Sequence, residues 1–496
     1  MKNELAVIPK PVSVKYAEGT FRSKGLPPFK GDDAFRGVIE TASYQMKDKI
    51  DNSLPSVSCE KIDGLEPEAY NLEIKKDRIT AQASSPAGMY HALQTIRQLS
   101  LSHFEDGELV LPCAKINDYP RFSWRGLMLD CSRYYYSVPF IKNLIDVISM
   151  HHINKFHWHL TDDQGWRLPV PEYPLLTEVG SVRKDNRRRR VFGGIYSDDE
   201  IKEVIDYAAS RHIETIPEVD LPGHACAILT SYPSLGCTGG KYHVEDRFGI
   251  FKDVLCAGND QIFDLAEKVF ETLARLFPSK YVHIGGDEVP PTRWKACPKC
   301  KKRLEELGLK KPAELQSWIT VKLVQMLSKH GKTAIGWDEI LEDTPGYQLP
   351  NDAVVMSWRG SKGGKKASKR GHNVIMTPNT EGCYLDYKHL DHPEEPGQMY
   401  AGASTVYISY SMDPAPSSIK KEDASHILGG QGNLWSELIY AGKFAEYMIF
   451  PRLCAIAEAV WTPRKNKDFE DFSQRLIVHR QRLDCLGVQQ YRGVLR

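Results

Sequence analysis

The sequence has no long apolar run, either at its N-terminus or further along the chain. The first residues, MKNELAVIPKPVSVKYAEGTF, contain no apolar stretch of the length that a signal peptide needs. No later segment approaches the roughly 20 apolar residues of a membrane-spanning helix. We therefore expect no membrane span and favour the cytoplasm, with the periplasm or secretion as the alternative if a signal has been removed.

The sequence also lacks an excess of charge of either sign. Lysine plus arginine (65) nearly equals aspartate plus glutamate (64) over the 496 residues. No global field therefore recruits nucleic acid or an acidic membrane surface, and we expect no nucleic-acid partner. Uncharged substrates fit this balance.

The eleven cysteines do not form a recognisable framework. An odd number in a chain of this length argues against a fully paired secreted protein. Cys237 and Cys256 flank a glycine-rich loop and are placed to pair in an oxidising compartment. Cys297 and Cys300 form a CxxC, but no second pair stands at the usual zinc spacing, so a polar loop with free thiols is favoured over structural zinc. We expect no metal and no cofactor.

The first part of the chain has the pattern of a small α/β domain. Residues 1–120 contain the alternating segments YNLEI and RITAQA, followed by the helical pattern GMYHALQTIRQL. The polar stretch NDYPRF, with its proline, marks a boundary near residue 120. A different pattern fills residues 121–496, which we predict to be a second domain that ends in a C-terminal helix.

Short apolar strands alternate with amphipathic helices through this second part. Eight strand-helix steps over about 350 residues predict a (β/α)₈ barrel with inserted loops. The predicted strands are RGLMLDCS, NKFHWHLTDD, IETIPEVD, YVHIGGDEV, KTAIGWDEI, AVVMSWRG, NVIMTPNT and GGQGNLWSE.

Polar and aromatic residues gather at the ends of the predicted strands. In such barrels the active site lies at the carboxyl ends of the strands. Capping and loop polarity explain a single residue of this kind, but not the same enrichment at nearly every strand. The residues concerned are Arg133, Asp162, Asp163, Asp220, Asp287, Glu288, Trp337, Asp338, Trp358, Trp435 and Glu437.

Two adjacent carboxylates end the strand YVHIGGDEV. Successive side chains of an extended strand point to opposite faces, so Asp287 and Glu288 face one site only if the backbone bends. Gly285 and Gly286 permit such a bend, because glycine tolerates left-handed and bulged conformations. The alternative is that one of the two acids is ordinary surface.

Tryptophans beside carboxylates indicate a sugar site, although large aromatics are also common in cores. Glycoside hydrolysis normally uses two carboxyl groups about 5–5.5 Å or about 6.5–9.5 Å apart. Neighbouring acids suit neither arrangement well. They fit substrate assistance, in which the 2-acetamido group of the sugar attacks the anomeric carbon.

The motif HIGGDEV resembles the signature of family 20 glycoside hydrolases, the β-N-acetylhexosaminidases, and the similarity extends through most of the chain to WSE. The resemblance implies an exo-acting, retaining enzyme that removes terminal β-linked GlcNAc or GalNAc through an oxazolinium ion. It implies that Glu288 protonates the glycosidic oxygen and that Asp287 steadies the acetamido nitrogen. HWHLTDDQGWR and EVDLPGHA are similar to the family motifs that link Asp162 and His224 to the catalytic acid.

The same resemblance extends to the residues that bind the sugar. It implies that Arg133 and Glu437 bind ring hydroxyls, that Tyr384 of CYLDY bonds the acetamido carbonyl, and that Asp386 bonds a further hydroxyl. The family's pocket tryptophans correspond to Trp337, Trp358 and Trp435.

Two other functions compete with this interpretation. His157 and His159 form an HxH at a strand end, which is typical of metal-dependent amidohydrolases, but no strand-end set completes the ligand shell and we expect both to pack under the site. A noncatalytic sugar-binding barrel requires loss of the acid pair, which is intact. For the basic run Arg187–Arg190, a solvated loop is favoured over contact with an anionic aglycone.

Overall fold

The computed structural model describes residues 5–185, 190–342, 344–400 and 402–496. Most of the basic run Arg187–Arg190 therefore lies outside the described residues. Within the described part of the chain, each helix is either too short or too polar to cross a bilayer.

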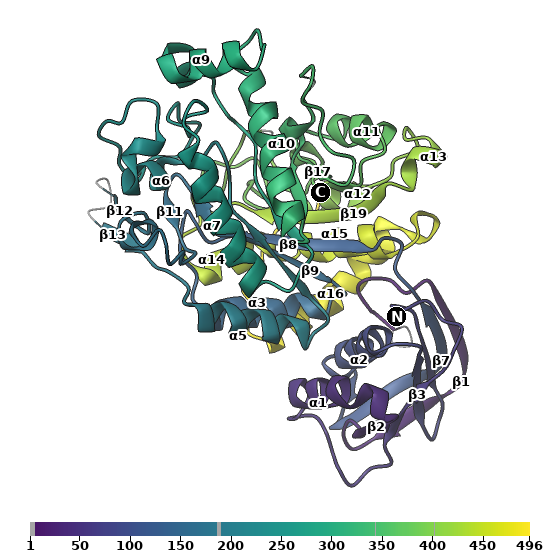
Figure 1. Cartoon of the computed structure of the whole chain (residues 1–496). Helices are drawn as coiled ribbons and strands as arrows, with labels where there is room; N and C mark the ends of the chain where they lie inside the picture. The colour runs from purple at the N-terminus through teal and green to yellow at the C-terminus, as the bar shows by residue number, and fades with distance from the viewer. Residues whose placement is uncertain (1–4, 186–189, 343, 401) are drawn as a thin grey trace.

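The N-terminal domain is a mixed sheet with two helices. Its strands follow the order β1-β7-β4-β5-β3-β2, with β6 added to β7. Alternating burial along β4 and β5 shows that one face of the sheet packs inward, as the sequence pattern predicts. Figure 1 shows α1 and α2 beside this sheet. The elements are β1 (Ser13–Ser23), β2 (Phe29–Gly31), α1 (Arg36–Gln45), β3 (Val57–Lys61), β4 (Tyr70–Ile74), β5 (Ile79–Ala83), α2 (Pro86–Ser100), β6 (Phe104–Glu105) and β7 (Glu108–Asp118).

A closed parallel barrel follows, which confirms the predicted (β/α)₈ fold (Figure 1). Its strands pair in chain order, and β19 closes the barrel by pairing with β8. Three of them are buried along their whole length and the other five at all but one residue, because helices cover the outside of a parallel sheet. The strands are β8 (Trp124–Asp130), β9 (Lys155–His159), β14 (Glu214–Glu218), β15 (Tyr281–His283), β16 (Thr333–Trp337), β17 (Val354–Ser357), β18 (Val374–Met376) and β19 (Ile427–Leu434).

Amphipathic helices form the outer layer of the barrel. In α7, for example, the buried residues recur three and four positions apart along the helix. The outer helices are α3 (Val138–Ser149), α5 (Asp198–Ala209), α7 (Gln261–Leu276), α10 (Glu314–Lys329), α11 (Lys362–Lys369), α12 (Val406–Ser411), α13 (Lys421–Ala424), α14 (Gly442–Ile449), α15 (Arg452–Trp461) and α16 (Phe469–Cys485). Between β16 and β17 the described residues form the 3₁₀ turn Asp338–Leu341 and no α-helix.

The loops at the carboxyl ends of the strands contain short helices and strands. They are β10 (Thr161–Asp162), β11 (Gly165–Trp166), α4 (Leu175–Glu178), β12 (Val182–Asp185), β13 (Arg190–Gly193), α6 (Cys226–Ser231), α8 (Thr292–Ala296) and α9 (Pro298–Glu306).

The C-terminal helix α16 binds Ala6 and Val7, near the start of the described chain. Arg475 donates a 2.8 Å hydrogen bond to the carbonyl of Val7, 468 residues away in the sequence. Arg482 donates to the carbonyl of Ala6. Trp461, at the end of α15, donates to Asp118 of the N-terminal sheet. The two domains are thus joined by buried hydrogen bonds between distant parts of the chain.

Candidate active site

A cavity of about 410 Å³ opens at the carboxyl ends of the barrel strands. The family resemblance assigns eleven residues to the site. Nine of these line the cavity, and the other two, Asp162 and Trp337, lie behind them. The lining residues are Arg133, His224, Phe248, Gly249, Ile250, Asp287, Glu288, Trp358, Asn379, Tyr384, Asp386, Tyr387, Tyr400, Trp435 and Glu437.

The backbone bends sharply where the two adjacent acids stand. Gly285 and Gly286 have φ of 67° and 93°, and Glu288 itself has φ of 48°. A Cβ on Gly285 would lie 1.8 Å from Oδ1 of Asp220, so a side chain there is excluded by space as well as by φ. The bend turns both Asp287 and Glu288 into the same cavity. The left-handed φ of Glu288 is unusual for a non-glycine residue and is typical of a functional site.

Asp287 is buried against a second carboxyl group, that of Asp220. The backbone N–H of Gly286 donates a 3.0 Å hydrogen bond to Oδ1 of Asp220 and holds this side chain in place. Burial and the negative charge of Asp220 raise the pKa of Asp287 well above its ordinary value. Burial likewise raises the pKa of Asp220, to about 6. The two carboxyl groups interact directly, and burial disfavours two negative charges side by side.

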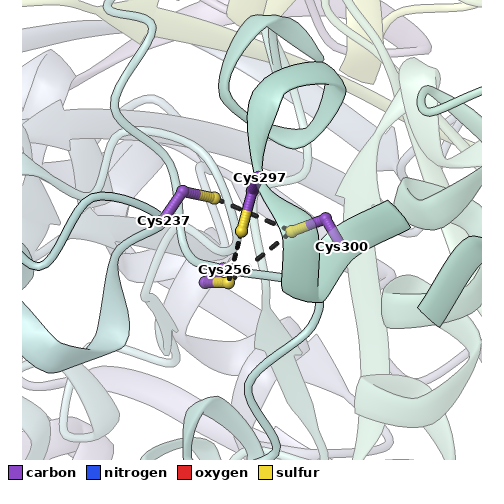
Figure 2. A group of neighbouring side chains, drawn as sticks. All are labelled: Cys237, Cys256, Cys297 and Cys300. Carbon is purple, nitrogen blue, oxygen red and sulfur yellow. Dashed lines mark hydrogen bonds between the residues drawn. The ribbon is translucent and has the colours of Figure 1, made fainter. Parts of the chain in front are cut away.

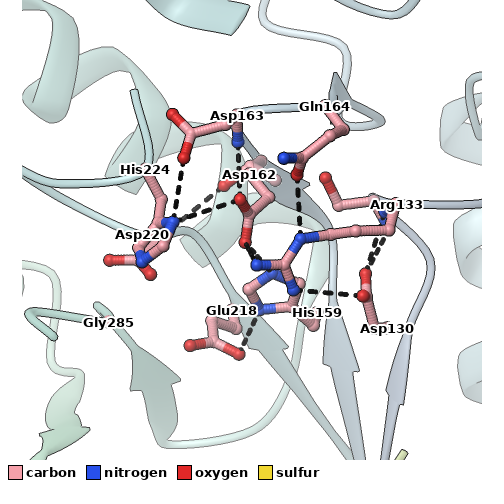
Figure 3. Close-up of polar contacts among 12 residues, drawn as sticks. Asp130, Arg133, His159, Asp162, Asp163, Gln164, Glu218, Asp220, His224 and Gly285 are labelled. Carbon is pink, nitrogen blue, oxygen red and sulfur yellow. Dashed lines mark hydrogen bonds and ion pairs between the residues drawn. The ribbon is translucent and has the colours of Figure 1, made fainter. Parts of the chain in front are cut away.

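His224 lies between two pairs of carboxylates, of which Figure 3 shows the first, Asp162 and Asp163. Its Nδ1 is 3.0 Å from Oδ2 of Asp163 and 3.2 Å from Oδ1 of Asp162. Its Nε2 is 3.7 Å from both Oδ2 of Asp287 and Oε2 of Glu288. Burial opposes a charge on the imidazole, but Asp162 and the other carboxylates prevail and raise its pKa well above the ordinary range. His224 thus contacts Asp163 as well as the predicted Asp162. The sequence motif did not assign a role to Asp163.

Arg133 is buried at the side of the cavity and has several acidic partners (Figure 3). Its guanidinium lies 2.8 Å from Asp162 and 3.1 Å from Asp130, and its Nε donates to Gln164. The same group lies over the ring of Trp435, 5.0 Å from the centroid. These contacts fix the guanidinium in one orientation.

Aromatic rings form one wall of the cavity. Trp358 and Tyr384 stack at 6.1 Å with an interplanar angle of 14°, and Trp435 lies 6.3 Å from Tyr384. The indole N–H of Trp358 donates to Glu339, which burial and the charge of Asp287 give a pKa of about 9. Flat apolar faces of this kind pack against sugar rings.

Trp337 differs from the other predicted tryptophans in its position. It is 1% exposed and does not line the cavity. Its ring lies 5.7 Å from that of Trp435, and its N–H donates to Glu218. Trp337 therefore supports the wall of the cavity from beneath.

Two of the carboxyl groups that line the cavity, those of Asp386 and Glu437, have free acceptor atoms. Oδ1 of Asp386 and Oε2 of Glu437 have no hydrogen-bond partner among the described residues. Burial raises the pKa of both groups, in Glu437 despite the nearby charge of Arg133. Because buried polar atoms are nearly always hydrogen-bonded, these oxygens indicate a ligand that carries donors such as hydroxyl groups.

A layer of buried histidines surrounds Glu218 below the cavity. The carboxylate of Glu218 lies 3.0 Å from Nε2 of His157 and 2.9 Å from Nδ1 of His283, and it also pairs with Nδ1 of His159. Nε2 of His159 faces Asp162 at 3.1 Å. His157 and His159 thus belong to a hydrogen-bonded network under the site, as we expected from the sequence. The sequence patterns did not single out Glu218 itself.

Family comparisons identify the class of barrel to which the chain belongs. The family model described as "Glycosyl hydrolase family 20, catalytic domain" matches residues 122–464, and "Glycosyl hydrolase family 20, domain 2" matches residues 4–119. The chain therefore belongs to glycosyl hydrolase family 20.

Individual relatives agree with this assignment. The chain is 41% identical over 444 residues to a β-hexosaminidase of Porphyromonas gingivalis. The match covers 88% of this chain but only 55% of that protein. The chain thus spans about half the length of this relative. A β-hexosaminidase of Akkermansia muciniphila is 33% identical, with 92% of each chain covered. The crystal structure of an exo β-N-acetylglucosaminidase from Vibrio harveyi in complex with N-acetylglucosamine has a TM-score of 0.89 at 30% identity, over 98% of this chain and 78% of that one.

Proposed function

We propose that the protein is an exo-acting β-N-acetylhexosaminidase, which removes terminal β-linked GlcNAc or GalNAc from an oligosaccharide or glycoconjugate. The observation that carries the proposal is the bend at Gly285–Glu288, which turns two neighbouring acids into one aromatic-walled cavity. A cavity of about 410 Å³ suits a single terminal sugar rather than a long internal segment. The carbohydrate in the V. harveyi complex supports the same substrate class.

The reaction we propose retains the anomeric configuration through substrate assistance. The acetamido oxygen of the sugar attacks the anomeric carbon while Glu288 donates a proton to the departing oxygen. Asp287 accepts a hydrogen bond from the acetamido N–H and stabilises the positive charge of the oxazolinium ion. Water then opens the ion, with Glu288 acting as the base. His224, 3.7 Å from both acids, orients them and stabilises their negative charge.

The remaining lining residues hold the sugar in our proposal. Arg133 donates hydrogen bonds to ring hydroxyls, and the free oxygens of Asp386 and Glu437 accept hydrogen bonds from others. The hydroxyl of Tyr384 donates to the acetamido carbonyl and aligns it for attack. Trp358 and Trp435 pack against the acetamido group and the ring.

Hydrolysis of two matched aryl glycosides tests this proposal. An aryl β-N-acetylglucosaminide should be cleaved with a high kcat/KM, and the corresponding N-acetylgalactosaminide should also be accepted. The plain β-glucoside should be almost inert, since it lacks the attacking oxygen. Comparable kcat/KM on the glucoside and the acetamido sugar would refute the substrate-assisted reaction.

We also propose the division of the chain at about residue 120 into the N-terminal α/β domain and the catalytic barrel. The separate hydrophobic core of the first domain supports this boundary. A reducing compartment such as the cytoplasm is our proposal for its location. The eleven cysteines support it, because none of them forms a disulfide in the structure and disulfides persist mainly in oxidising compartments.

A further inference from the structure

Four cysteine sulfurs converge in the loops above the barrel, outside the candidate active site (Figure 2). The Sγ atoms of Cys237 and Cys300 are 3.7 Å apart, those of Cys256 and Cys297 are 3.8 Å apart, and those of Cys256 and Cys300 are 3.6 Å apart. All four sulfurs lie within 4.8 Å of one another. We call this group the four-cysteine cluster.

Two separate connections of the barrel supply the cluster. Cys297 and Cys300 come from the loop after β15, where Cys297 caps α9 and Cys300 lies in its first turn. Both are buried, which differs from the polar loop that the sequence favoured. Cys237 and Cys256 come from the loop after β14 and are brought together by a bridge between Gly236 and Leu255.

Close backbone packing brings these two loops into contact. A Cβ at Gly258 would lie 2.3 Å from the carbonyl carbon of Lys299, so only glycine allows the approach. The backbone N–H of Gly258 lies near the sulfurs of both Cys256 and Cys300. N–H donors directed at sulfur stabilise thiolates.

The sulfur separations match a metal site and not a disulfide. A disulfide requires about 2.05 Å between the sulfurs. A tetrahedral zinc ion with Zn–S bonds of about 2.3 Å places its sulfur ligands about 3.8 Å apart. The three separations between 3.6 and 3.8 Å agree with this tetrahedron.

Four thiolates around one Zn²⁺ carry a net charge of minus two. Arg293 and Arg303, which pair first with Asp253 and Asp260, also lie close enough to interact electrostatically with Cys237 and Cys256 respectively. Burial of three of the four cysteines below 6% exposure closes the site to a water ligand, as in structural zinc sites.

We propose that the four-cysteine cluster binds a structural zinc ion through Cys237, Cys256, Cys297 and Cys300. The ion fastens both ends of the 237–256 loop to the start of α9. That loop carries Phe248, Gly249 and Ile250, which line the cavity. On the other side, α9 is joined through α8 to the segment that bears Asp287 and Glu288. Zinc at this place fixes one wall of the cavity without touching the sugar.

Metal analysis of the unmodified protein tests the proposal directly. Protein purified without chelators should contain one zinc ion per chain by mass spectrometry of the metal, retained through dialysis. A mercurial thiol reagent should release this zinc in step with modification of the cysteines. Protein produced with cobalt should show the sulfur-to-cobalt charge-transfer bands of a tetrahedral tetrathiolate.

Substitutions assign the zinc to these cysteines. The double variant Cys297→Ser and Cys300→Ser should lose the zinc, and its KM for an aryl glycoside should rise several-fold because the cavity wall loosens. Cys59→Ser is the matched control, since Cys59 is a buried cysteine in the N-terminal sheet and its loss should leave the zinc content unchanged.

Three results would overturn the proposal. They are a metal-free protein whose four cysteines react freely, a metal-free protein whose intact mass shows disulfides, and a protein that binds a single iron in place of zinc. If the double variant does not fold, the metal content and cobalt spectrum of the unmodified protein decide between these outcomes.

Discussion

The carboxyl pair of Asp220 and Asp287 allows one prediction with a calculable size. Asp220→Asn removes a negative charge and preserves the local contacts, because the asparagine oxygen still accepts from the N–H of Gly286 and the amide donates to Asp287. One carboxylate oxygen of Asp220 lies within 4.8 Å of one carboxylate oxygen of Asp287. At an effective dielectric constant of about 20, two unit charges at that distance repel by roughly 3.5 kcal/mol, which corresponds to about 2–3 pKa units.

The sign of the effect follows from the role we propose for Asp287. The present pKa of Asp287 lies well above its ordinary value, and the groups that face it are Asp220, His224, Glu288 and Glu339. Asp287 must be ionised to stabilise the oxazolinium ion. In Asp220→Asn its pKa falls, so the acidic limb of kcat/KM against pH should move by about 2 units towards lower pH.

Two assays check this prediction. The pH profile of an aryl N-acetylglucosaminide is measured for the parent and for Asp220→Asn, with the exposed Asp206→Asn as a control for the same chemical change. An unchanged acidic limb in Asp220→Asn would refute the reasoning. Thermal unfolding gives an independent readout. A pKa raised from 3.8 to about 6 means stability is lost as the pH rises through that interval, so above pH 6 the variant should melt at a higher temperature.

Three further predictions concern the lining residues. Glu288→Gln should lose roughly 10²–10⁴-fold in kcat/KM on poor leaving groups and much less on nitrophenolates, whereas Asp287→Asn should slow all aryl glycosides alike; the reverse pattern would exchange their roles. Arg133→Lys should raise KM strongly, because a lysine cannot reproduce the guanidinium contacts to Asp162 and Asp130, and an unchanged KM would contradict the binding role. Trp358→Ala should weaken an N-acetylglucosamine-derived inhibitor by more than tenfold in Kd, measured by calorimetry, since it removes the stacked wall beside Tyr384.

Much of the barrel and the cavity could be predicted from local sequence. Nearly every strand is a short apolar run that ends in acids or aromatics, and the double glycine before Asp287 predicts the bend that the structure contains. These signals lie within a few residues of one another, so no knowledge of the closed barrel is needed to interpret them.

The rest depends on contacts that only the closed barrel creates. Glu218 lies opposite His159 and His283 in neighbouring strands, and this register is not visible in any single motif. Trp337 lies behind Trp435, which lines the cavity, and the two rings meet only when their strands close the barrel. Cys237 and Cys256 meet the CxxC only because two loops pack through Gly258.

The hydrogen bonds from α16 to Ala6 and Val7 have a consequence for biosynthesis. The ribosome releases Ala6 and Val7 long before it makes Arg482 and Arg475, which bind their carbonyl groups. The last strand of the N-terminal sheet ends at Asp118. The carbonyl group of Val7, however, is bound by Arg475 of α16, which lies 468 residues further along the chain than Val7. The joint between the two domains is therefore completed only after translation of α16, and a chain interrupted before that helix would leave these buried carbonyl groups without their arginines.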